Sequence, residues 1–218
     1  GEAVKLGTIQ TKVSDMAFDY SSGVMYAITD DTQISMVDTS NGEMYPVLTQ
    51  EDQVLVALTV DEKGTVYVIG RKAGSTQADA SLYLTAGTLT KIGDTGQKAV
   101  MEQSMTYDFE NGYIYWAQAW AKAGEGRELN LCIVNPKNGY ASVIGKIGES
   151  GSEVSALYCD SPDEPQAPYV ELEDIHIGQG AETDLIVGGE LQLQVSADPI
   201  HATNKDYQYT TDQRDVAT

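Results

Sequence analysis

Short runs in which apolar and polar residues alternate follow one another between residues 13 and 148, with turn residues between the runs. Alternation with a period of two is typical of strands that have one buried face. Three stretches share one plan: a strand, a polar turn closed by glycine, and a second strand with tyrosine three residues after that glycine. Glycine suits such turns because it adopts a positive φ without a Cβ clash. The three predicted hairpins begin at Met16, Ala57 and Met105, and their turns are closed by Gly23, Gly64 and Gly112.

Each hairpin is followed by a matching second half of two further short strands, over residues 34–48, 81–93 and 129–145. The closing glycines lie 41 and 48 residues apart. Four short antiparallel strands that recur at such a period are typical of β-propeller blades. The sequence therefore predicts an all-β, propeller-like region at 1–161 with three full blades. Their predicted bounds are about 13–50, 54–96 and 101–148.

The two ends of this region resemble single strands of further blades. Val4–Ile9 resembles the fourth strand of a blade, and Val154–Asp160 resembles the first strand of another. A closed propeller needs about four or more blades, so three full blades and these partial strands leave the ring incomplete. Further blades could precede Gly1 or come from a second chain. We favour missing sequence before Gly1, where a leader could also have been removed.

The character of the chain changes after residue 161. Three prolines within 161–168 predict a semi-rigid linker at 162–169. Beyond the linker, Leu191, Leu193 and Val195 alternate with polar residues, as in a strand that has one wet face.

Residues 170–218 resemble the first half of a bacterial Ig-like domain, group 2, a family of β-sandwich modules found on bacterial surface and secreted proteins. The resemblance rests on Leu185–Glu190 and the alternating leucines after it, on the turn Pro199–Thr203 and on Val216–Thr218. Tyr209 stands where the family usually has tryptophan. The resemblance implies part of an Ig-like β-sandwich, in which one edge and one inner face lack the second half of the domain.

The chain is strongly acidic: 13 Lys and Arg residues stand against 33 Asp and Glu residues, which gives a formal net charge of −20. Nucleic acids and anionic membranes both attract cationic side chains and repel such a surface. We therefore expect no nucleic-acid partner. No run of about 18 apolar residues is present, so direct membrane insertion is not expected either.

Residue types that usually build catalytic and metal sites form no recognisable pattern here. Cys132 and Cys159 lack CxxC spacing, and either a disulfide or two buried thiols fits them. His176 and His201 lie 25 residues apart, without cysteines or a nucleophile placed to join them. No calcium loop, phosphate-binding loop, dinucleotide fingerprint or nucleophile elbow occurs. We expect no catalytic residue, no metal and no cofactor in this chain.

Asp19, Asp108 and Asp160 recur at equivalent positions of the repeats. They could line a central channel and hold a cation, or each could accept hydrogen bonds from amides of the adjoining turn. Recurrence favours the hydrogen-bonding role, because a structural requirement repeats with the unit. The alignment places Val60 at this position of the second repeat, which also argues against a ring of cation ligands.

The connection between the second and third strands differs most between the repeats. It is a short turn at Asp30–Thr32 in the first repeat, and it expands to 70–79 and 119–127 in the others. In propellers this connection lies on the same rim as the crossovers between blades, the face that usually binds ligands. A tryptophan ring suits such a face because it buries a large area with few rotamers to restrict. The predicted ligand-binding residues are Trp120, Arg71, Arg127 and Trp116, of which Trp116 lies in a strand and is better suited to packing.

These features predict a secreted or cell-surface bacterial module for binding, adhesion or display, without catalysis in this chain. Its partner would be a glycan or a protein bound on the loop-rich propeller face. The alternative is the non-catalytic portion of a carbohydrate-active or other hydrolytic propeller enzyme whose active site lies in missing sequence. Binding without turnover separates the two functions.

Overall fold

The computed structural model describes residues 4–5, 7–100, 103–122, 124, 126–149, 151–159, 172–177 and 195–198. The chain divides into two compact units, Gly1–Pro168 and Tyr169–Thr218. All regular structure in the described ranges is β, and three antiparallel sheets have four strands each. The predicted all-β class and the predicted four-stranded repeats are confirmed. Within these ranges, no helix has the length and apolar character needed to cross a membrane.

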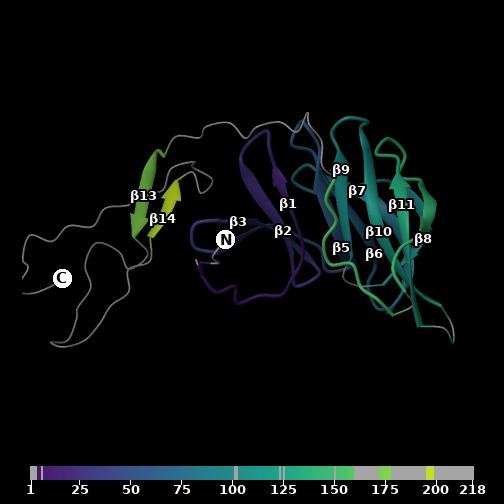
Figure 1. Cartoon of the computed structure of the whole chain (residues 1–218). Coiled ribbons are helices and arrows are strands. Elements are labelled where there is room, and N and C mark those ends of the chain that lie inside the picture. Colours follow the sequence, from purple (N-terminus) through teal and green to yellow (C-terminus); the bar gives the residue numbers. More distant parts are fainter. Residues whose placement is uncertain are drawn as a thin grey trace, which may run out of the picture. The chain divides into compact units, whose positions relative to one another are not determined.

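Each four-stranded sheet is built from consecutive strands in chain order (Figure 1). The first sheet contains β1 (Val13–Asp19), β2 (Val24–Thr29), β3 (Gln33–Val37) and β4 (Met44–Thr49). The second contains β5 (Gln53–Val60), β6 (Val66–Lys72), β7 (Ala78–Thr85) and β8 (Leu89–Ala99). The third contains β9 (Ser104–Asp108), β10 (Tyr113–Lys122), β11 (Gly126–Val134) and β12 (Ala141–Lys146). The sheets begin and end within a few residues of the stretches predicted as blades.

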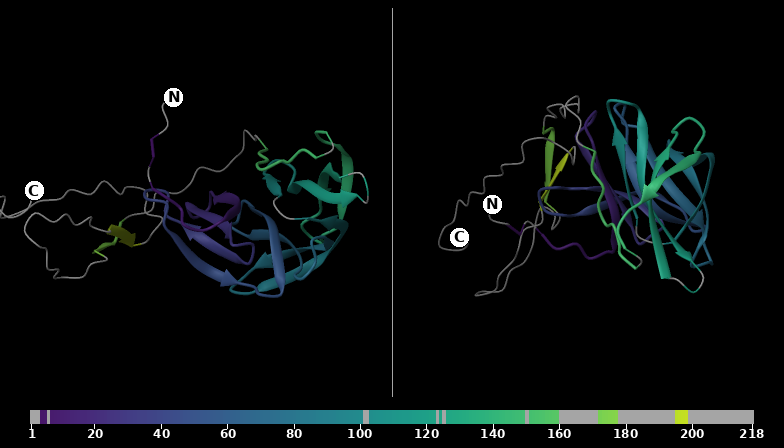
Figure 2. Two further views of the ribbon diagram at one scale, coloured as in Figure 1. Left: turned by 90° about the horizontal axis from the view of Figure 1, so that it is seen from below. Right: turned by 45° about the vertical axis from the view of Figure 1, so that its right-hand side comes forward.

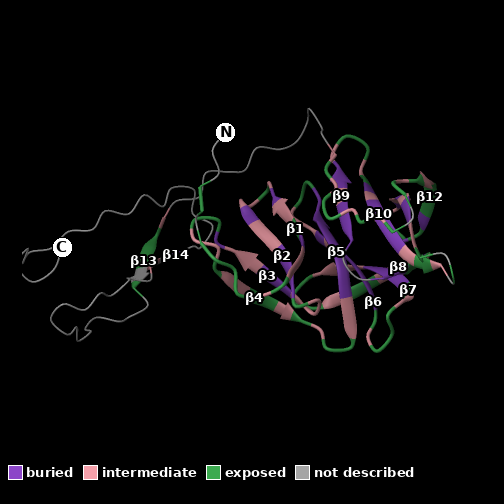
Figure 3. Cartoon of the chain, turned by 60° about the horizontal axis from the view of Figure 1, so that its bottom comes forward, coloured by how far each residue is buried: buried purple, intermediate pink, exposed green. Residues whose placement is uncertain are grey.

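The first strands of the three sheets are the inner strands, and the later strands extend away from them. β1 packs against β5 and β5 packs against β9, so the sheets follow one another side by side (Figure 2). As a result β5 is buried along most of its length, whereas the outer strands β4 and β12 are mostly exposed or half-buried (Figure 3).

The hydrophobic core lies between the facing surfaces of the sheets. Its largest fully buried apolar side chains come from all three sheets: Ile28, Ile34, Leu55, Leu58, Ile69, Leu82, Ile114 and Trp116. Burial of each such side chain contributes roughly 1.5–3 kcal/mol relative to exposure. Packing between sheets therefore supplies much of the stability that a single sheet of four short strands lacks.

Aspartates at the ends of inner strands accept hydrogen bonds from the turns that follow them. Asp19 Oδ1 accepts the N–H of the second residue after it at 2.8 Å. Asp108 Oδ1 accepts the second and third N–H groups after it at 3.0 and 3.1 Å. The predicted hydrogen-bonding role is confirmed for these two residues, and Asp160 lies outside the described residues.

In the second sheet, Asp61 takes this role. Its Oδ1 accepts the Lys63 and Thr65 N–H groups at 2.9 and 2.8 Å, and its carbonyl accepts the Gly64 N–H at 3.1 Å. As predicted, Val60 occupies the repeat position of Asp19 and Asp108, and the aspartate that accepts these hydrogen bonds follows it. The β5–β6 connection, 61–65, is one residue longer than 20–23 and 109–112, so this aspartate lies in the turn and not at the end of the strand.

One buried carboxyl joins the inner strands of all three sheets. Asp15, on β1, is 7% exposed, and its Oδ2 accepts the Leu58 N–H of β5 at 2.9 Å. Its Oδ1 accepts the Ser104 hydroxyl of β9 at 3.0 Å. Burial raises the pKa of Asp15 to about 7, although the hydrogen bonds it accepts oppose that rise. Asp15 therefore links three sheets through a single side chain.

The two partial strands predicted at the ends of this region are not strands in the structure. Described residues among 4–10 are exposed and outside any strand, and residues 152–159 form no strand either. A strand must pair its N–H and C=O groups with a neighbour, and the described sheets pair their strands among themselves. The Leu157 N–H still bonds to Ser104 Oγ at 3.1 Å and the Cys159 N–H to Thr106 Oγ1 at 3.3 Å, so this segment runs beside β9.

The second unit is described at two strands. β13 (Asp174–Ile177) and β14 (Val195–Asp198) pair antiparallel, with Ile175 opposite Ala197. The predicted linker and the segments with the Ig-like resemblance lie outside the described residues, namely 162–169, 185–190, 199–203 and 216–218. The Ig-like sandwich therefore stays a prediction.

The two cysteines are not joined to each other. Cys132 lies fully buried in β11, and burial raises the pKa of its thiol to about 12. Such a thiol stays protonated at neutral pH and is a poor nucleophile. Cys132 therefore serves as a small apolar side chain of the core.

Candidate functional site

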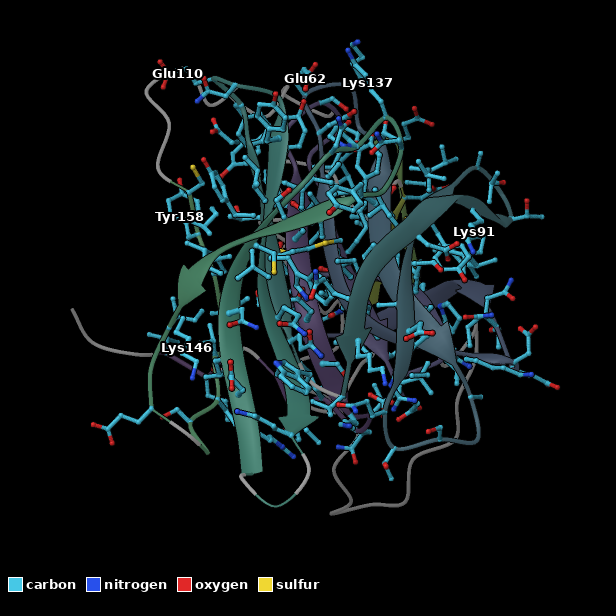
Figure 4. The ribbon with its side chains drawn as sticks, turned by 90° about the vertical axis from the view of Figure 1, so that its right-hand side faces the viewer. Glu62, Lys91, Glu110, Lys137, Lys146 and Tyr158 are labelled. Carbon is cyan, nitrogen blue, oxygen red and sulfur yellow. The ribbon has the colours of Figure 1, made fainter. Side chains whose placement is uncertain are left out.

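A groove of about 230 Å³ lies across the inner strands. It is called the inner groove below, and its lining residues are Met16, Ala17, Phe18, Tyr20, Thr59, Val60, Met105, Thr106, Tyr107, Phe109, Leu157 and Tyr158. Met16 and Tyr158 are 51% and 65% exposed. Tyr158 projects from the segment beside β9 (Figure 4). The inner groove thus presents apolar and aromatic surface to solvent.

Four aromatic rings form a continuous edge-to-face cluster in this groove. The ring centroids of Phe18 and Tyr20 lie 4.9 Å apart, and those of Tyr20 and Phe109 lie 5.8 Å apart. Tyr107 and Phe109 follow at 5.3 Å. Edge-to-face pairs contribute about 0.5–1.5 kcal/mol beyond the area they bury. The contact between Tyr20 and Phe109 joins the first sheet to the third, which holds the rings in fixed positions.

The repeat explains why aromatic residues meet here. Phe18 and Tyr107 occupy the same repeat position, and so do Tyr20 and Phe109. The second sheet has the small Thr59 at the first of these positions. The first and third sheets therefore line the groove with aromatic side chains, and the second sheet, between them, lines it with a smaller one. The predicted site residues do not include this groove, although an aromatic pair repeated in two of three hairpins was a signal for it.

Carboxylates border the aromatic cluster at the turn end of the inner strands. The Tyr107 hydroxyl donates a hydrogen bond to Glu62, which lowers the pKa of Glu62. Burial, and then this bond, raise the pKa of Tyr107. The Tyr67 hydroxyl donates to Asp61 Oδ2 at 3.4 Å. Figure 4 shows Glu62, Glu110 and Lys137 at the same end of the sheets, so this end of the groove is bordered by charged groups of both signs and by hydrogen-bond acceptors.

The connections between second and third strands lie beside the crossovers between sheets. The Leu55 N–H, near the start of the second sheet, bonds to the Asp31 carbonyl at 2.7 Å. In the third sheet the Gly151 N–H bonds to the Arg127 carbonyl at 3.1 Å. This surface is called the crossover rim below, and it comprises the described residues of 30–32, 50–52, 73–77, 100–103, 122–126 and 147–152.

Arg71, a predicted ligand-binding residue, lies beneath the crossover rim rather than on it. It is 2% exposed, and its Nη1 donates to the Lys72 carbonyl at 3.3 Å and to the Ser75 carbonyl. Its Nε has no hydrogen-bond partner among the described residues. Burial lowers the pKa of Arg71, and the nearby charge of Asp31 opposes that effect. The guanidinium holds the loop at 73–77 in place, and its role toward a ligand stays a prediction.

Trp120 and Arg127 lie on paired strands at the rim, where Trp120 is opposite Glu128. Both are half-buried, and Arg127 forms an ion pair with Glu153. Trp116 lies four residues earlier in β10, is 0% exposed and packs in the core. Arg127 is opposite Ala121, so Trp120 and Arg127 lie at the same end of the sheet but on opposite faces of it. Trp116 lies farther along β10. That any of them binds a ligand stays a prediction.

A small cavity of about 70 Å³ beside Arg127 is lined mainly by charged side chains. Glu128 lies between Lys122 and Lys146, at 3.8 and 3.3 Å. Glu128 is thus shared by two lysines, and a cavity of this size is far below the volume of usual ligand pockets. The inner groove is therefore the better candidate for binding a ligand.

The shortest loop of the crossover rim contains two non-glycine residues in the left-handed region. Asp30 has φ 50° and Asp31 has φ 61°. Two-residue hairpin turns with this geometry usually contain Asn-Gly, and each such residue costs about 1 kcal/mol or more. The Asp31 carboxylate accepts the Ser14 hydroxyl at 2.6 Å and the Lys12 ammonium at 3.0 Å. These bonds offset part of the cost.

Metal-binding side chains are not gathered anywhere in the described part of the chain. No group of three or more His, Cys, Asp or Glu residues there is placed to hold a metal ion. His176 lies in β13, and His201 lies outside the described residues.

Comparison with known proteins gives only distant likenesses. No family model matches the chain, and no curated protein matches it. A protein of unknown function from Bacteroides caccae is similar in structure, with a TM-score of 0.39 and 7% identity over 66% of this chain and 48% of that one. The major Malassezia sympodialis allergen Mala s 1 has a TM-score of 0.41 and 12% identity over 66% of this chain and 52% of that one. The chain spans about half the length of the solved structures to which it is similar.

Proposed function

We propose that this chain is a non-catalytic binding module in which the three sheets are propeller blades and the inner groove holds the ligand. The observation that supports this function most is the aromatic cluster, since Phe18, Tyr20, Tyr107 and Phe109 line a solvent-facing groove in fixed edge-to-face contact. Preorganised aromatic rings bind a ligand with little loss of side-chain freedom.

The chemistry of the groove favours a neutral glycan. Flat aromatic faces pack against the apolar faces of sugar rings, and carboxylates such as Glu62 accept hydrogen bonds from hydroxyl groups. A net charge of −20 repels sulfated or phosphorylated ligands. A secreted or cell-surface location, for adhesion or display, is part of this proposal and is supported by the Ig-like resemblance of residues 170–218.

Glycan-array screening of the full chain, followed by calorimetric titration of the best neutral oligosaccharide, tests the function. We expect saturable binding without turnover. Tyr20→Ala and Phe109→Ala should each weaken binding tenfold or more, about 1.4 kcal/mol, because each removes a stacking surface. Tyr20→Phe should retain binding, since it keeps the ring.

Two controls distinguish the groove from other surfaces. Trp120→Ala alters the end of β10 beside the crossover rim, and Tyr140→Ala removes a tyrosine that is 59% exposed and outside the groove. Both should bind as the unmodified chain does. Loss of binding in Trp120→Ala alone would move the site to the rim. Hydrolysis of a glycan by the chain, or absence of any glycan binding, would contradict the proposal.

A further inference from the structure

Two glycines of this chain lie against a turn of a neighbouring sheet. A Cβ on Gly93, in β8, would come closer than 3.0 Å to the carbonyl oxygen of Asn138, in the β11–β12 turn. A Cβ on Gly7 would come closer than 3.0 Å to the carbonyl oxygen of Asn41, in the β3–β4 turn. Neither glycine has a positive φ. Both positions therefore require glycine because of the close approach of a neighbouring carbonyl, and not because of backbone conformation.

The two turns are built alike. The Asp38 carbonyl accepts the Gly42 N–H at 2.7 Å, and the Asn135 carbonyl accepts the Gly139 N–H at 2.8 Å. In each turn the residue before the closing glycine is an asparagine whose carbonyl meets the opposing glycine. The same contact thus occurs twice, each time between an Asn-Gly turn and a glycine from the segment that precedes that sheet.

Gly145, in β12, occupies the position in the third sheet that corresponds to Gly93 in the second. It follows Ile144 as Gly93 follows Ile92. Its φ is not positive, and nothing lies within 4 Å of where its Cβ would be. Val143 and Ile144 beside it are 47% and 57% exposed. In the described part of the chain, this outer edge therefore has the glycine of the contact and no turn against it.

The inner strand of the third sheet, β9, also makes the kind of hydrogen bond that joins the inner strands of neighbouring sheets. In the first junction, the Leu58 N–H bonds to Asp15 at 2.9 Å. At the third sheet, the Leu157 N–H bonds at 3.1 Å to Ser104, the residue at the same repeat position as Asp15. Residues 157–159 thus lie beside β9 much as β5 lies beside β1. The third sheet therefore has both features by which neighbouring sheets contact each other here: a glycine on its outer strand and a hydrogen-bonding side chain on its inner strand.

We propose that the β12 edge around Gly145 docks a second copy of this chain, whose β3–β4 turn places the Asn41 carbonyl against Gly145. In this docking, residues 144–147 of one copy replace residues 6–9 of the other copy beside the β3–β4 turn. The sequence supports this replacement, because both segments have the order apolar, glycine, polar, isoleucine. Residues 7–10 are exposed and outside any strand, so their displacement from the turn of the second copy loses little packing.

The inner strand completes the junction. β1 of the second copy takes the place of residues 157–159, which are held at β9 by the N–H bonds of Leu157 and Cys159 to side-chain hydroxyls. Each copy offers both halves of the junction. Two copies therefore close a ring of six sheets with two-fold symmetry and leave neither edge open. The arrangement continues the sheet-to-sheet contacts already present within one chain. It does not require the proposed ligand, and it moves Leu157 and Tyr158 away from the inner groove.

Sedimentation equilibrium of the full chain tests the docking. The measurement is made in about 0.5 M NaCl, which screens the repulsion between copies that each have a net charge of −20. We expect a reversible dimer. Gly145→Ala should weaken it at least tenfold and Gly145→Val should abolish it, because a Cβ there would meet the Asn41 carbonyl oxygen.

The two Gly145 variants should fold normally, since a Cβ at this position meets open space in the single chain. Their thermal midpoints, measured on the monomer, should stay within about 2 °C of the unmodified chain. Thr90→Val places a valine of matched size at an exposed position of β8 and should leave the dimer intact. A chain that is monomeric at every concentration, or a dimer that Gly145→Val does not weaken more than Thr90→Val does, would overturn the proposal.

Discussion

At the scale of single residues, Asp15 shows how position decides the behaviour of a carboxyl group. The equivalent positions of the second and third sheets are occupied by Val56 and Ser104. The Val56 side chain has no hydrogen-bonding group, whereas the Ser104 hydroxyl bonds directly to Asp15. Ser104 Oγ also accepts the Leu157 N–H. The aspartates at the strand ends, by contrast, accept hydrogen bonds within their own hairpins. That role was predictable from recurrence, but the role of Asp15 was not, because it depends on which strands become neighbours.

The raised pKa of Asp15 makes stability depend on pH. The folded chain holds this proton with a pKa of about 7, against the ordinary 3.8. Its contribution to stability is therefore full below about pH 4 and is lost as the pH rises to about 7. Between pH 5 and 8, the free energy of unfolding should fall by about 2–3 kcal/mol from this group alone.

Urea unfolding of the unmodified chain and of Asp15→Asn at pH 5 and 8 measures this contribution. Asparagine keeps an acceptor for Leu58 and a donor for Ser104 but does not titrate. From pH 5 to pH 8, the free energy of unfolding of the unmodified chain should fall by about 2–3 kcal/mol relative to that of Asp15→Asn. A pH-independent difference would show that Asp15 does not titrate with a raised pKa.

At the scale of elements, the strands were largely predictable and their junctions were not. The alternation of apolar and polar residues and the glycine-closed turns located all twelve strands of the three sheets. The segments at 4–9 and 154–160 have the same local pattern, yet their described residues form no strand. A pattern predicts that a segment can be a strand, whereas a partner strand decides whether it becomes one.

The Gly93 contact gives a test of the junction between the second and third sheets. Gly93→Ala should destabilise the chain by at least 2 kcal/mol, because overpacking against a fixed backbone carbonyl forces the sheets apart. Gly145→Ala is the matched control and should change stability by less than about 0.5 kcal/mol. Thermal unfolding of the monomeric chain measures both. Equal effects of the two substitutions would show that the β11–β12 turn moves aside easily.

At the scale of the whole molecule, the acidic charge and the all-β class followed from the sequence, but the location of the candidate site did not. Loops long enough to bind a ligand drew attention to Trp120, Arg71 and Arg127. Arg71 proved to be buried by its own loop, and the aromatic cluster formed where inner strands meet. Residues such as Tyr20 and Phe109 are 89 positions apart, and only the packing of three sheets brings them together.

The same packing predicts that the three sheets unfold as one. Trp116 and Trp120 both lie in the third sheet, so tryptophan fluorescence reports on that sheet. Asp15→Ala removes bonds from the first sheet to both others and should lower the urea midpoint seen by fluorescence and by far-UV circular dichroism equally. Separate midpoints for the two signals would mean that the sheets unfold independently.

The bond between Asp15 and Ser104 also affects how the chain acquires its structure during synthesis. The two residues are separated by 89 positions, so Asp15 leaves the ribosome long before its partner exists. Until β9 is made, Asp15 Oδ2 can accept the Leu58 N–H but Oδ1 lacks the Ser104 hydroxyl, so the first two sheets must leave that oxygen open to water. Contacts between such distant residues are slow to form, so an emerging chain of this kind exposes the inner edges of its first two sheets until the third has been made.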